Sequence, residues 1–277
     1  MKETTTLKAL LTLALITFFS LTGISQLLLE ENFDYPSGDL LTDHGWTAHS
    51  GGGTQPVTVN AGGLNFTGYP GTGTGNAALL DNNGEDVNHV FPAQTAGTVF
   101  VSFMVNVTTT AAGYFLHLGG DPIGTTFRGK VFMDASNHFG LSMGSNTGTF
   151  ATATYNPGTT YVLVLKYEVV SGTTNDIVSL FIFDSALPSS EPATPAVGPL
   201  TDPAMSDINP GAIALRQFLA TQNLLIDGIR IGMSWGDILP ASITPPTVQA
   251  QDIAFSNITS SAMSATWTNG NGAKRVT

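Results

Sequence analysis

The chain contains no cysteine among its 277 residues. This absence excludes disulfide bonds, thiolate metal sites and a cysteine nucleophile, so packing alone must stabilise an exported form. Charge is also scarce: Asp, Glu, Lys and Arg make up 10% of the chain, and nine Lys and Arg against 20 Asp and Glu give a formal net charge of −11. A nucleic-acid binder neutralises phosphates with clustered Lys and Arg, and these nine are scattered. The sequence therefore excludes nucleic acid and anionic membranes as partners.

Helical periodicity is also lacking, because no long stretch beyond residue 26 repeats apolar residues with the period of a helix. Glycine is instead abundant, with 31 residues, and β-branched and aromatic residues gather in short runs. The clearest pattern places Tyr161–Val170 and Ile177–Phe183 on either side of the polar turn SGTTND, which predicts a β-hairpin. Short strands without intervening helices favour an all-β fold of two packed antiparallel sheets. Further strands are predicted at 97–107, 114–118, 127–133, 139–143, 212–216 and 224–233.

The first 25 residues are typical of a signal peptide. Lys2 and Lys8 precede an apolar run at 9–21, and Gly23 and Ser25 place small residues before a cut after Ser25. The run is shorter than the ~20 apolar residues that span a bilayer, so we expect cleavage and no later membrane insertion. The sequence therefore predicts an extracellular or cell-surface location.

Several longer segments resemble a known family. They are ENFDYPSGDLLTDHGW at 31–46, GTGNAALLDNNGEDVN at 73–88, the hairpin at 161–183 and LLIDGIRIGMSWGD at 224–237. Together they resemble exported Bacteroidetes proteins that carry a concanavalin A-like (laminin G-like) module. The resemblance implies an antiparallel jelly-roll β-sandwich.

The end of the chain shows a different pattern. Residues 188–210 are rich in proline and predict a long loop within the sandwich, because proline does not fit a central strand. A boundary is expected near Pro240. The segment beyond it resembles the first two strands of a fibronectin type III domain, with Trp267 on the second, and such a sandwich needs seven strands. The expected domains are a signal peptide at 1–25, the jelly roll at 26–240, and a linker with a partial fibronectin type III domain at 241–277.

No arrangement of carboxylates predicts an enzyme. Glycoside hydrolysis needs two carboxylates that face each other across a cleft, and laminarinase-like members of the fold carry them as E-x-D-x-x-E, which is absent here. Glu85 and Asp86 are adjacent, so on a strand they would point to opposite faces. The segment 81–86 is read mainly as a solvated turn, with a cation-binding loop and a substrate contact as alternatives. The sequence Gly140-Leu-Ser-Met-Gly144 imitates a nucleophile elbow, but no helix follows it.

A binding role is the function that the sequence favours. We expect an exported, non-catalytic binding or adhesion module for a glycan or cell-surface polymer, with a polysaccharide-active hydrolase or lyase as the alternative. Sugars bind through aromatic rings stacked on their apolar faces and through polar groups that bond to hydroxyls. Trp46 and Trp235 lie near the two ends of the module and are expected to pack there. The candidate ligand-binding residues are Tyr69, Tyr114, Tyr155, Asn82, Asp86 and Arg128.

A structural calcium ion is the one cofactor that we expect. In jelly rolls of this kind the first and last strands lie side by side, and a carboxylate near each can share a cation. Glu31 and Asp227 are the candidate ligands, with Asp34 and the carbonyl of Gly51 as weaker helpers. In the alternative reading, Asp227 caps the bend before Gly228 while Glu31 is solvated.

Overall fold

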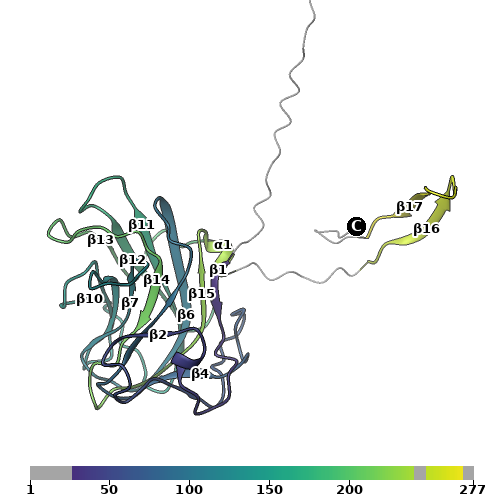
Figure 1. The fold of residues 1–277 in the computed structure, drawn as a ribbon. Helices are drawn as coiled ribbons and strands as arrows, with labels where there is room; N and C mark the ends of the chain where they lie inside the picture. The colour runs from purple at the N-terminus through teal and green to yellow at the C-terminus, as the bar shows by residue number, and fades with distance from the viewer. Residues whose placement is uncertain (1–26, 240–247, 271–277) are drawn as a thin grey trace, which may run out of the picture.

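The computed structural model describes residues 27–239 and 248–270 (Figure 1). The predicted signal peptide and most of the predicted linker lie outside these residues. Within the described part, no helix is long and apolar enough to cross a membrane. The two helical elements there are single turns, η1 (Leu41–Asp43) and α1 (Trp235–Ile238), which confirms the all-β prediction.

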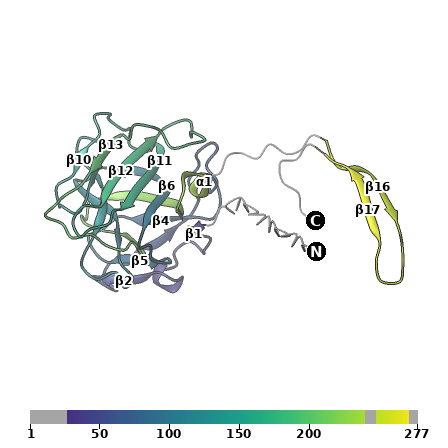
Figure 2. The same ribbon diagram turned by 90° about the horizontal axis from the view of Figure 1, so that it is seen from above.

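Two antiparallel sheets pack face to face as a jelly-roll β-sandwich. The eight-stranded sheet runs in the order β13 (Val197–Leu200), β12 (Ile177–Phe183), β11 (Thr160–Val169), β6 (Gly97–Thr109), β15 (Asn223–Gly232), β4 (Ala77–Leu80) and β3 (Thr58–Asn60), and β1 (Leu27–Glu31) also pairs with β15. The seven-stranded sheet runs in the order β10 (Thr149–Phe150), β9 (Phe139–Ser142), β8 (Arg128–Met133), β7 (Gly113–Gly119), β14 (Ala212–Leu215), β5 (Asp86–Val90) and β2 (Thr47–Ser50). Figure 2 shows β12, β11 and β6 side by side in the order of their pairing.

Alternation along the strands builds the core between the sheets. In β8 the residues Val131 and Met133 belong to the main hydrophobic cluster. Since successive side chains of a strand point to opposite faces, Arg128, Lys130 and Phe132 lie on the outer face of the sheet. In β7 a register shift turns Phe115 and Leu116 both toward the core, while Tyr114 and His117 lie outside.

The outer faces of the two sheets differ. A second hydrophobic cluster covers the outer face of the eight-stranded sheet, where Trp235 and Ile238 of α1 pack with Phe100 and Phe181. Ser234 and Asp237 form a capping box that fixes the start of α1. The outer face of the seven-stranded sheet is lined instead by polar and aromatic side chains, and we call it the polar face. It comprises His49, Asp86, Asn88, Tyr114, His117, Arg128, Lys130, Phe132, Ala214 and Arg216.

The predicted strands all appear, but the proline-rich loop contains one more. Within 188–210 the structure forms β13, which includes Pro199. β13 lies at the edge of its sheet, and proline is tolerated there because an edge strand leaves amides without a ladder partner. The prediction of a continuous loop was therefore wrong at 197–200.

The tail forms a hairpin. β16 (Gln251–Ser256) pairs antiparallel with β17 (Ser264–Thr268), and Trp267 lies on the second strand, as expected. The apolar side chains Phe255, Ile258 and Met263 are exposed. Two strands agree with the start of a fibronectin type III domain, and that assignment stays a prediction.

Candidate functional site

Two cations flank Tyr114 on the polar face. The Nζ atom of Lys130 lies 4.6 Å from the centroid of the Tyr114 ring, and the Cζ atom of Arg216 lies 4.1 Å from it. β8, which carries Lys130, and β14, which Arg216 directly follows, pair with opposite edges of β7. The two cations therefore approach the ring from opposite sides, in an arrangement that the negative ring faces favour.

A pocket of about 350 Å³ opens beside this cluster. Its walls combine the rings of Tyr114, Phe132 and Phe218 with the amide of Asn146 and the guanidinium of Arg216. Asn146 lines the pocket, and its side-chain oxygen accepts a hydrogen bond of 2.8 Å from Lys130 Nζ. Apolar walls with a few oriented polar groups are typical of small-ligand sites.

The absence of a side chain at Gly113 lets Phe218 form its wall of the pocket. A Cβ atom at Gly113 would lie 2.3 Å from Cε2 of Phe218, which is closer than real Cβ atoms approach other atoms. The backbone amide of Phe218 donates a hydrogen bond to the side-chain oxygen of Gln222, which fixes the chain at this position. The pocket therefore depends on a glycine at the start of β7.

Two histidines lie farther along the polar face. The rings of His49 and His117 are 5.8 Å apart and perpendicular. They come from β2 and β7, which are separated by β5 and β14. Ala214 of β14 pairs with His117 on one side and Asn88 on the other, and its small side chain leaves room for the rings.

The histidines hold unused hydrogen-bonding atoms. His117 is 0% exposed, and burial lowers its pKa to about 3, so its ring is neutral. Burial also lowers the pKa of His49. The Nε2 atoms of both rings are buried and have no hydrogen-bond partner. Unpartnered polar atoms in a buried position are costly, so these nitrogens are candidate contacts for a ligand or a bound water.

Two charged groups of the polar face, Lys130 and Asp86, have perturbed pKa values. Burial, with Arg216 and Arg128 nearby, lowers the pKa of Lys130 to about 8. Burial raises the pKa of Asp86 to about 6, against the opposing effects of the Gln217 amide and of Arg216. Perturbed groups that gather in one place are a feature of functional sites.

The six ligand-binding residues predicted from the sequence do not all lie at this site. The structure brings Tyr114, Asp86 and Arg128 together on the polar face, and the remaining three candidates lie elsewhere. Tyr69 is 1% exposed, and its hydroxyl bonds to Ser102 and to the carbonyl of Gly228, so no ring face is left for a sugar and this prediction was wrong. It failed because the segment 64–72 covers the eight-stranded sheet instead of forming an open loop.

The other two residues also occupy different surroundings. Tyr155 packs between Phe139 and Tyr161 at the margin of the main core, away from the polar face. Asn82 lies in the exposed turn and donates to the side chain of Gln55. Trp46 is buried beside Phe33, in agreement with the packing role expected for it.

The turn at 81–86 is less solvated than expected. Glu85 is 2% exposed, and its Oε2 atom accepts a hydrogen bond from the amide of Gly53. Asp86 begins β5 and accepts the amide hydrogen of Gln217. The side chain of Gln217 in turn accepts the amides of Asp81 and Asn82. Glu85 is therefore buried, with its Oε1 atom left without a hydrogen-bond partner, and Asp86 is partly buried, so the expectation of a solvated turn was wrong for Glu85.

The candidate calcium ligands are surrounded by hydrogen-bond donors. Glu31 is 5% exposed and accepts from the amide of Phe33, the hydroxyl of Tyr35 and the indole of Trp46. The alternative reading of a solvated Glu31 was therefore wrong. Asp227 accepts the amide of Gly228, as expected for a cap, and also the amide of Leu64.

The weaker helpers do not join them. Asp34 is exposed, and the carbonyl of Gly51 accepts the amide of Thr54. Among residues 27–239 and 248–270, no group of three or more His, Asp and Glu side chains is arranged to hold a metal ion. Nothing here tests calcium at Glu31 and Asp227 directly, but the hydrogen-bond donors around both carboxylates weigh against it.

Sequence reasoning missed Lys130, Arg216, His49 and His117. A usable signal was present in β8, where Arg128, Lys130 and Phe132 alternate with Val131 and Met133. A strand with polar residues on one face and apolar residues on the other reveals an outer face, but not which residues of other strands lie beside it.

Comparisons with known proteins add a likeness of fold. No known protein family matches the chain, and no curated protein does. Among solved structures, the chain is similar to the T. cruzi calreticulin globular domain, with 14% identity, a TM-score of 0.47, and coverage of 77% of this chain and 91% of that one. It is also similar to an endo-1,3-β-glucanase from Streptomyces sioyaensis, with 12% identity, a TM-score of 0.46, and coverage of 74% and 95%.

A third similar structure is domain 4 of AbnA, a GH43 extracellular arabinanase from Geobacillus stearothermophilus, in complex with arabinotriose. The identity is 17%, the TM-score is 0.39, and the match covers 76% of this chain and 93% of that one. At such identities the similarity concerns the fold alone.

Proposed function

We propose that the protein is an exported, non-catalytic carbohydrate-binding module whose polar face holds an extracellular or cell-surface glycan. The observation that carries the proposal is the pocket beside Tyr114, where aromatic walls meet an amide and a guanidinium. The volume of about 350 Å³ is at the lower end of small-ligand pockets, which suits one sugar residue of a longer chain. The remaining polar face offers room for neighbouring residues of the glycan.

The side chains of the pocket match the two kinds of surface that a sugar presents. Phe218, which is partly exposed, offers apolar ring surface to the C–H groups of a sugar ring. Asn146 and Arg216 carry N–H donors, and the Tyr114 hydroxyl both donates and accepts, so these groups fit hydroxyl partners. Adhesion and surface attachment would follow from binding a polymer outside the cell.

The arrangement of carboxylates favours binding over hydrolysis. Asp86 bonds to the amide of Gln217, whereas the side chain of its neighbour Glu85 bonds to Gly53. These two carboxylates therefore point to different partners and do not face each other across the pocket, as a hydrolytic pair would.

A polysaccharide lyase is the second candidate, and the observation that favours it is Lys130. Its pKa is about 8, and a general base works best when its pKa is close to the pH of the reaction. The Lys130 ammonium also lies over the Tyr114 ring. A lyase would cleave the glycan by elimination and leave an unsaturated sugar end, whereas a binding module would release nothing.

The test is affinity electrophoresis of the purified protein through gels that contain different soluble polysaccharides. We expect retardation by at least one polymer, with no reducing or unsaturated ends released. Phe218→Ala and Asn146→Ala should each weaken retention roughly tenfold, since each removes one contact of the pocket. Tyr155→Phe, outside the polar face, is the matched control and should migrate like the parent protein. Release of unsaturated ends would favour the lyase, and unchanged retention in both pocket variants would refute the site.

A further inference from the structure

The cations of the sandwich divide into two groups. Lys166 pairs with Glu168 and Glu191, and Arg230 pairs with Glu30. Arg128, Lys130 and Arg216 have no ion pair with a carboxylate in the part of the chain that the structure describes. All three lie on the polar face. A chain with a net charge of −11 therefore keeps three cations without an ion pair on one face, although Asp202 and Asp207 act on Arg128 at longer range.

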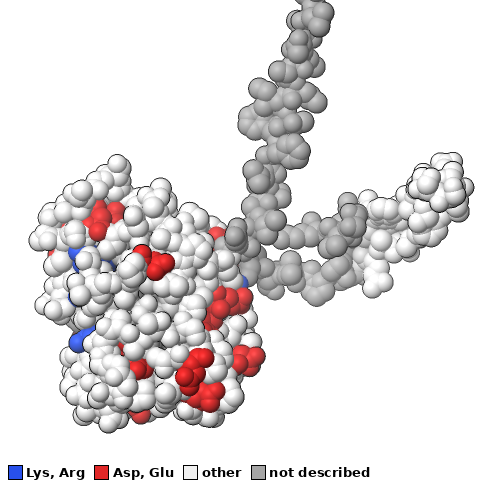
Figure 3. Space-filling view, in the orientation of Figure 1, with Lys and Arg blue, Asp and Glu red and all other residues white. Residues whose placement is uncertain are grey.

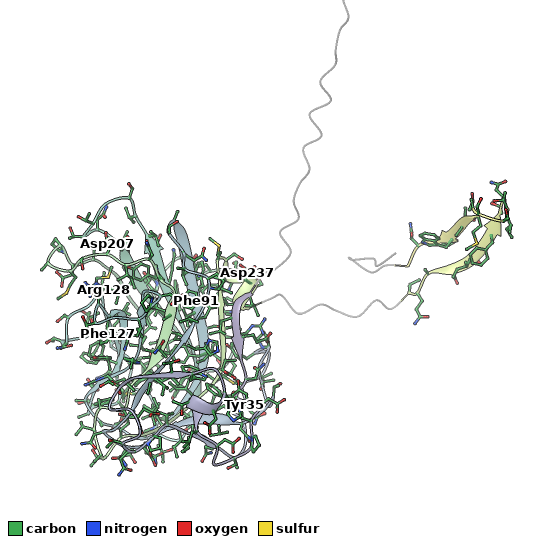
Figure 4. All side chains as sticks on the ribbon, viewed as in Figure 1. Tyr35, Phe91, Phe127, Arg128, Asp207 and Asp237 are labelled. Carbon is green, nitrogen blue, oxygen red and sulfur yellow. The ribbon has the colours of Figure 1, made fainter. Side chains whose placement is uncertain are left out.

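The surface view shows the same separation. In Figure 3 most of the blue surface lies along the left side of the sandwich, whereas much of the red surface lies at the right and the bottom. Figure 4 labels Phe127 and Arg128 on that left side, with Asp207 near them, whereas Tyr35 and Asp237 lie on the other side. Asp207 and Asp202 partly offset Arg128, so the positive field of this face comes mainly from Lys130 and Arg216, and such fields attract anions.

The three cations also act on one another. Lys130 is 6% exposed, and Arg128 and Arg216 both disfavour its charged form. Burying like charges near one another without a counter-charge is unfavourable. Arg216 lowers the pKa of Asp86, but burial still holds that pKa at about 6, so Asp86 offsets Arg216 only above that pH and leaves Lys130 without a counter-charge. An anionic ligand would supply the missing counter-charge.

One of the cations, Arg216, lines the pocket and keeps donors available for such a ligand. It has five N–H donors and uses one on the carbonyl of Tyr114. Lys130 donates to Asn146 in the pocket wall, but it is nearly buried and does not line the pocket itself, so it contributes mainly its charge. Arg128 donates to Ser206 and to the carbonyl of Phe127, so its guanidinium holds the loop around Ser206.

The position of Tyr114 points in the same direction. Lys130 and Arg216 occupy both sides of its ring, so this ring is not free to stack on a neutral sugar as the sequence suggested. Its role is to hold the two cations apart at the edge of the pocket. Recognition at this place is therefore ionic more than aromatic.

We propose that the glycan is acidic, and that Arg216 binds its carboxylate or sulfate groups at the pocket beside Tyr114, while Lys130 adds positive charge next to the pocket. This inference rests on the proposed function. A charge-assisted hydrogen bond from a guanidinium or an ammonium is about twice as strong as a neutral one, and a planar guanidinium can hold both oxygens of one acidic group.

The test compares four polymers by calorimetry with the purified protein. They are polygalacturonate, its carboxyl-reduced form, a sulfated galactan and its desulfated form. Each pair shares a backbone and differs in charge. We expect at least one acidic polymer to bind 10-fold or more tightly than its neutral partner, and the pair that responds identifies carboxylate or sulfate. Raising the salt from about 0.05 to about 0.5 M should weaken this binding, because salt screens exposed charges.

Substitutions locate the effect. Arg216→Gln and Lys130→Gln should each lower the affinity for the acidic polymer about 10- to 100-fold, and circular dichroism verifies that the variants fold. Lys166→Gln removes one positive charge from the other sheet and should leave the affinity unchanged. Equal affinity for acidic and neutral polymers would overturn this inference and leave the proposed function intact. Failure to bind any of the four would overturn both.

Discussion

Asp86 shows how a single residue can differ from the role that its sequence suggests. In the sequence it belongs to an acidic turn, yet in the structure it begins β5 and is largely buried on the polar face. Burial raises its pKa from 3.8 to about 6, because the charged form loses water that one amide hydrogen bond does not fully replace. The folded state therefore binds this proton more tightly than the unfolded state does.

This shift predicts a pH dependence of stability. A group whose pKa is raised on folding contributes stability that is fully present below pH 3.8 and is lost as the pH rises to about 6. Asp86→Asn should remove that loss, because an amide oxygen can still accept the Gln217 hydrogen. We expect the free energy of unfolding to favour the variant by on the order of 1 kcal/mol more at pH 7 than at pH 4, after allowing for solvent screening.

Urea unfolding of both proteins at several pH values between 4 and 7 measures this difference. Asp227 has a pKa raised to about 7 and contributes in the same direction, but it is present in both proteins and cancels. Asp81→Asn, in the exposed part of the same turn, is the control. If the free energy of unfolding changes with pH in the same way for the parent protein and for Asp86→Asn, the raised pKa of Asp86 is contradicted.

At the scale of elements, sequence patterns succeeded where a strand is long and continuously apolar. β6, β11 and β15 are long, apolar and adjacent in the eight-stranded sheet, and the sequence predicted all three. β5 and β13 were missed because polar residues or proline mask strands whose pairing is decided by distant partners. Local propensity does not contain that information.

The junction of β7 with the pocket gives a prediction for an element. Gly113→Ala would place a methyl group 2.3 Å from the Phe218 ring, and the exposed side of the pocket lets the ring move. We expect a stability loss of about 1 kcal/mol and a several-fold loss of glycan affinity, because overpacking is relieved by shifting the pocket wall.

The matched control is Gly120→Ala, just beyond the other end of β7. There the nearest heavy atom to a new Cβ is 3.6 Å away, an ordinary contact. Calorimetry with the same polymer should show unchanged affinity for this variant. Equal affinity of both variants would mean that the wall formed by Phe218 does not contact the ligand.

At the scale of the whole molecule, folding brings residues that are far apart in the sequence to one face of the sandwich. Arg128 and Lys130 share one strand, and their alternation with Val131 could have been read from the sequence. Arg216 and His49 come from distant segments, and only the pairing of β14 with β7 and of β2 with β5 brings them to the same face. The sequence suggested that the basic residues form no patch, and the fold overturns that view for three of them.

The closure of the sandwich provides the last prediction. β1 pairs with β15, so Glu31 and Asp227 lie near the junction of the first and last strands of the sandwich, and Glu31 disfavours the charged form of Asp227. A calcium ion there would relieve this repulsion, and at about 100 times its dissociation constant it would add roughly 2.7 kcal/mol of stability. However, calcium needs six to eight oxygen ligands, whereas N–H and O–H donors already surround both carboxylates.

We therefore expect these N–H and O–H donors to stabilise the two carboxylates without a metal ion. Melting curves of the protein in calcium and in chelator should then coincide. Trp46→Phe would remove one donor from Glu31 and keep an aromatic ring, so it should lower the melting temperature equally in both buffers. A shift that calcium produces in the parent protein and that Asp227→Asn abolishes would instead establish a calcium site at the strand junction. In that case the amides of Leu64 and Gly228 would have to turn away from Asp227, which amide hydrogen exchange in the two buffers would detect.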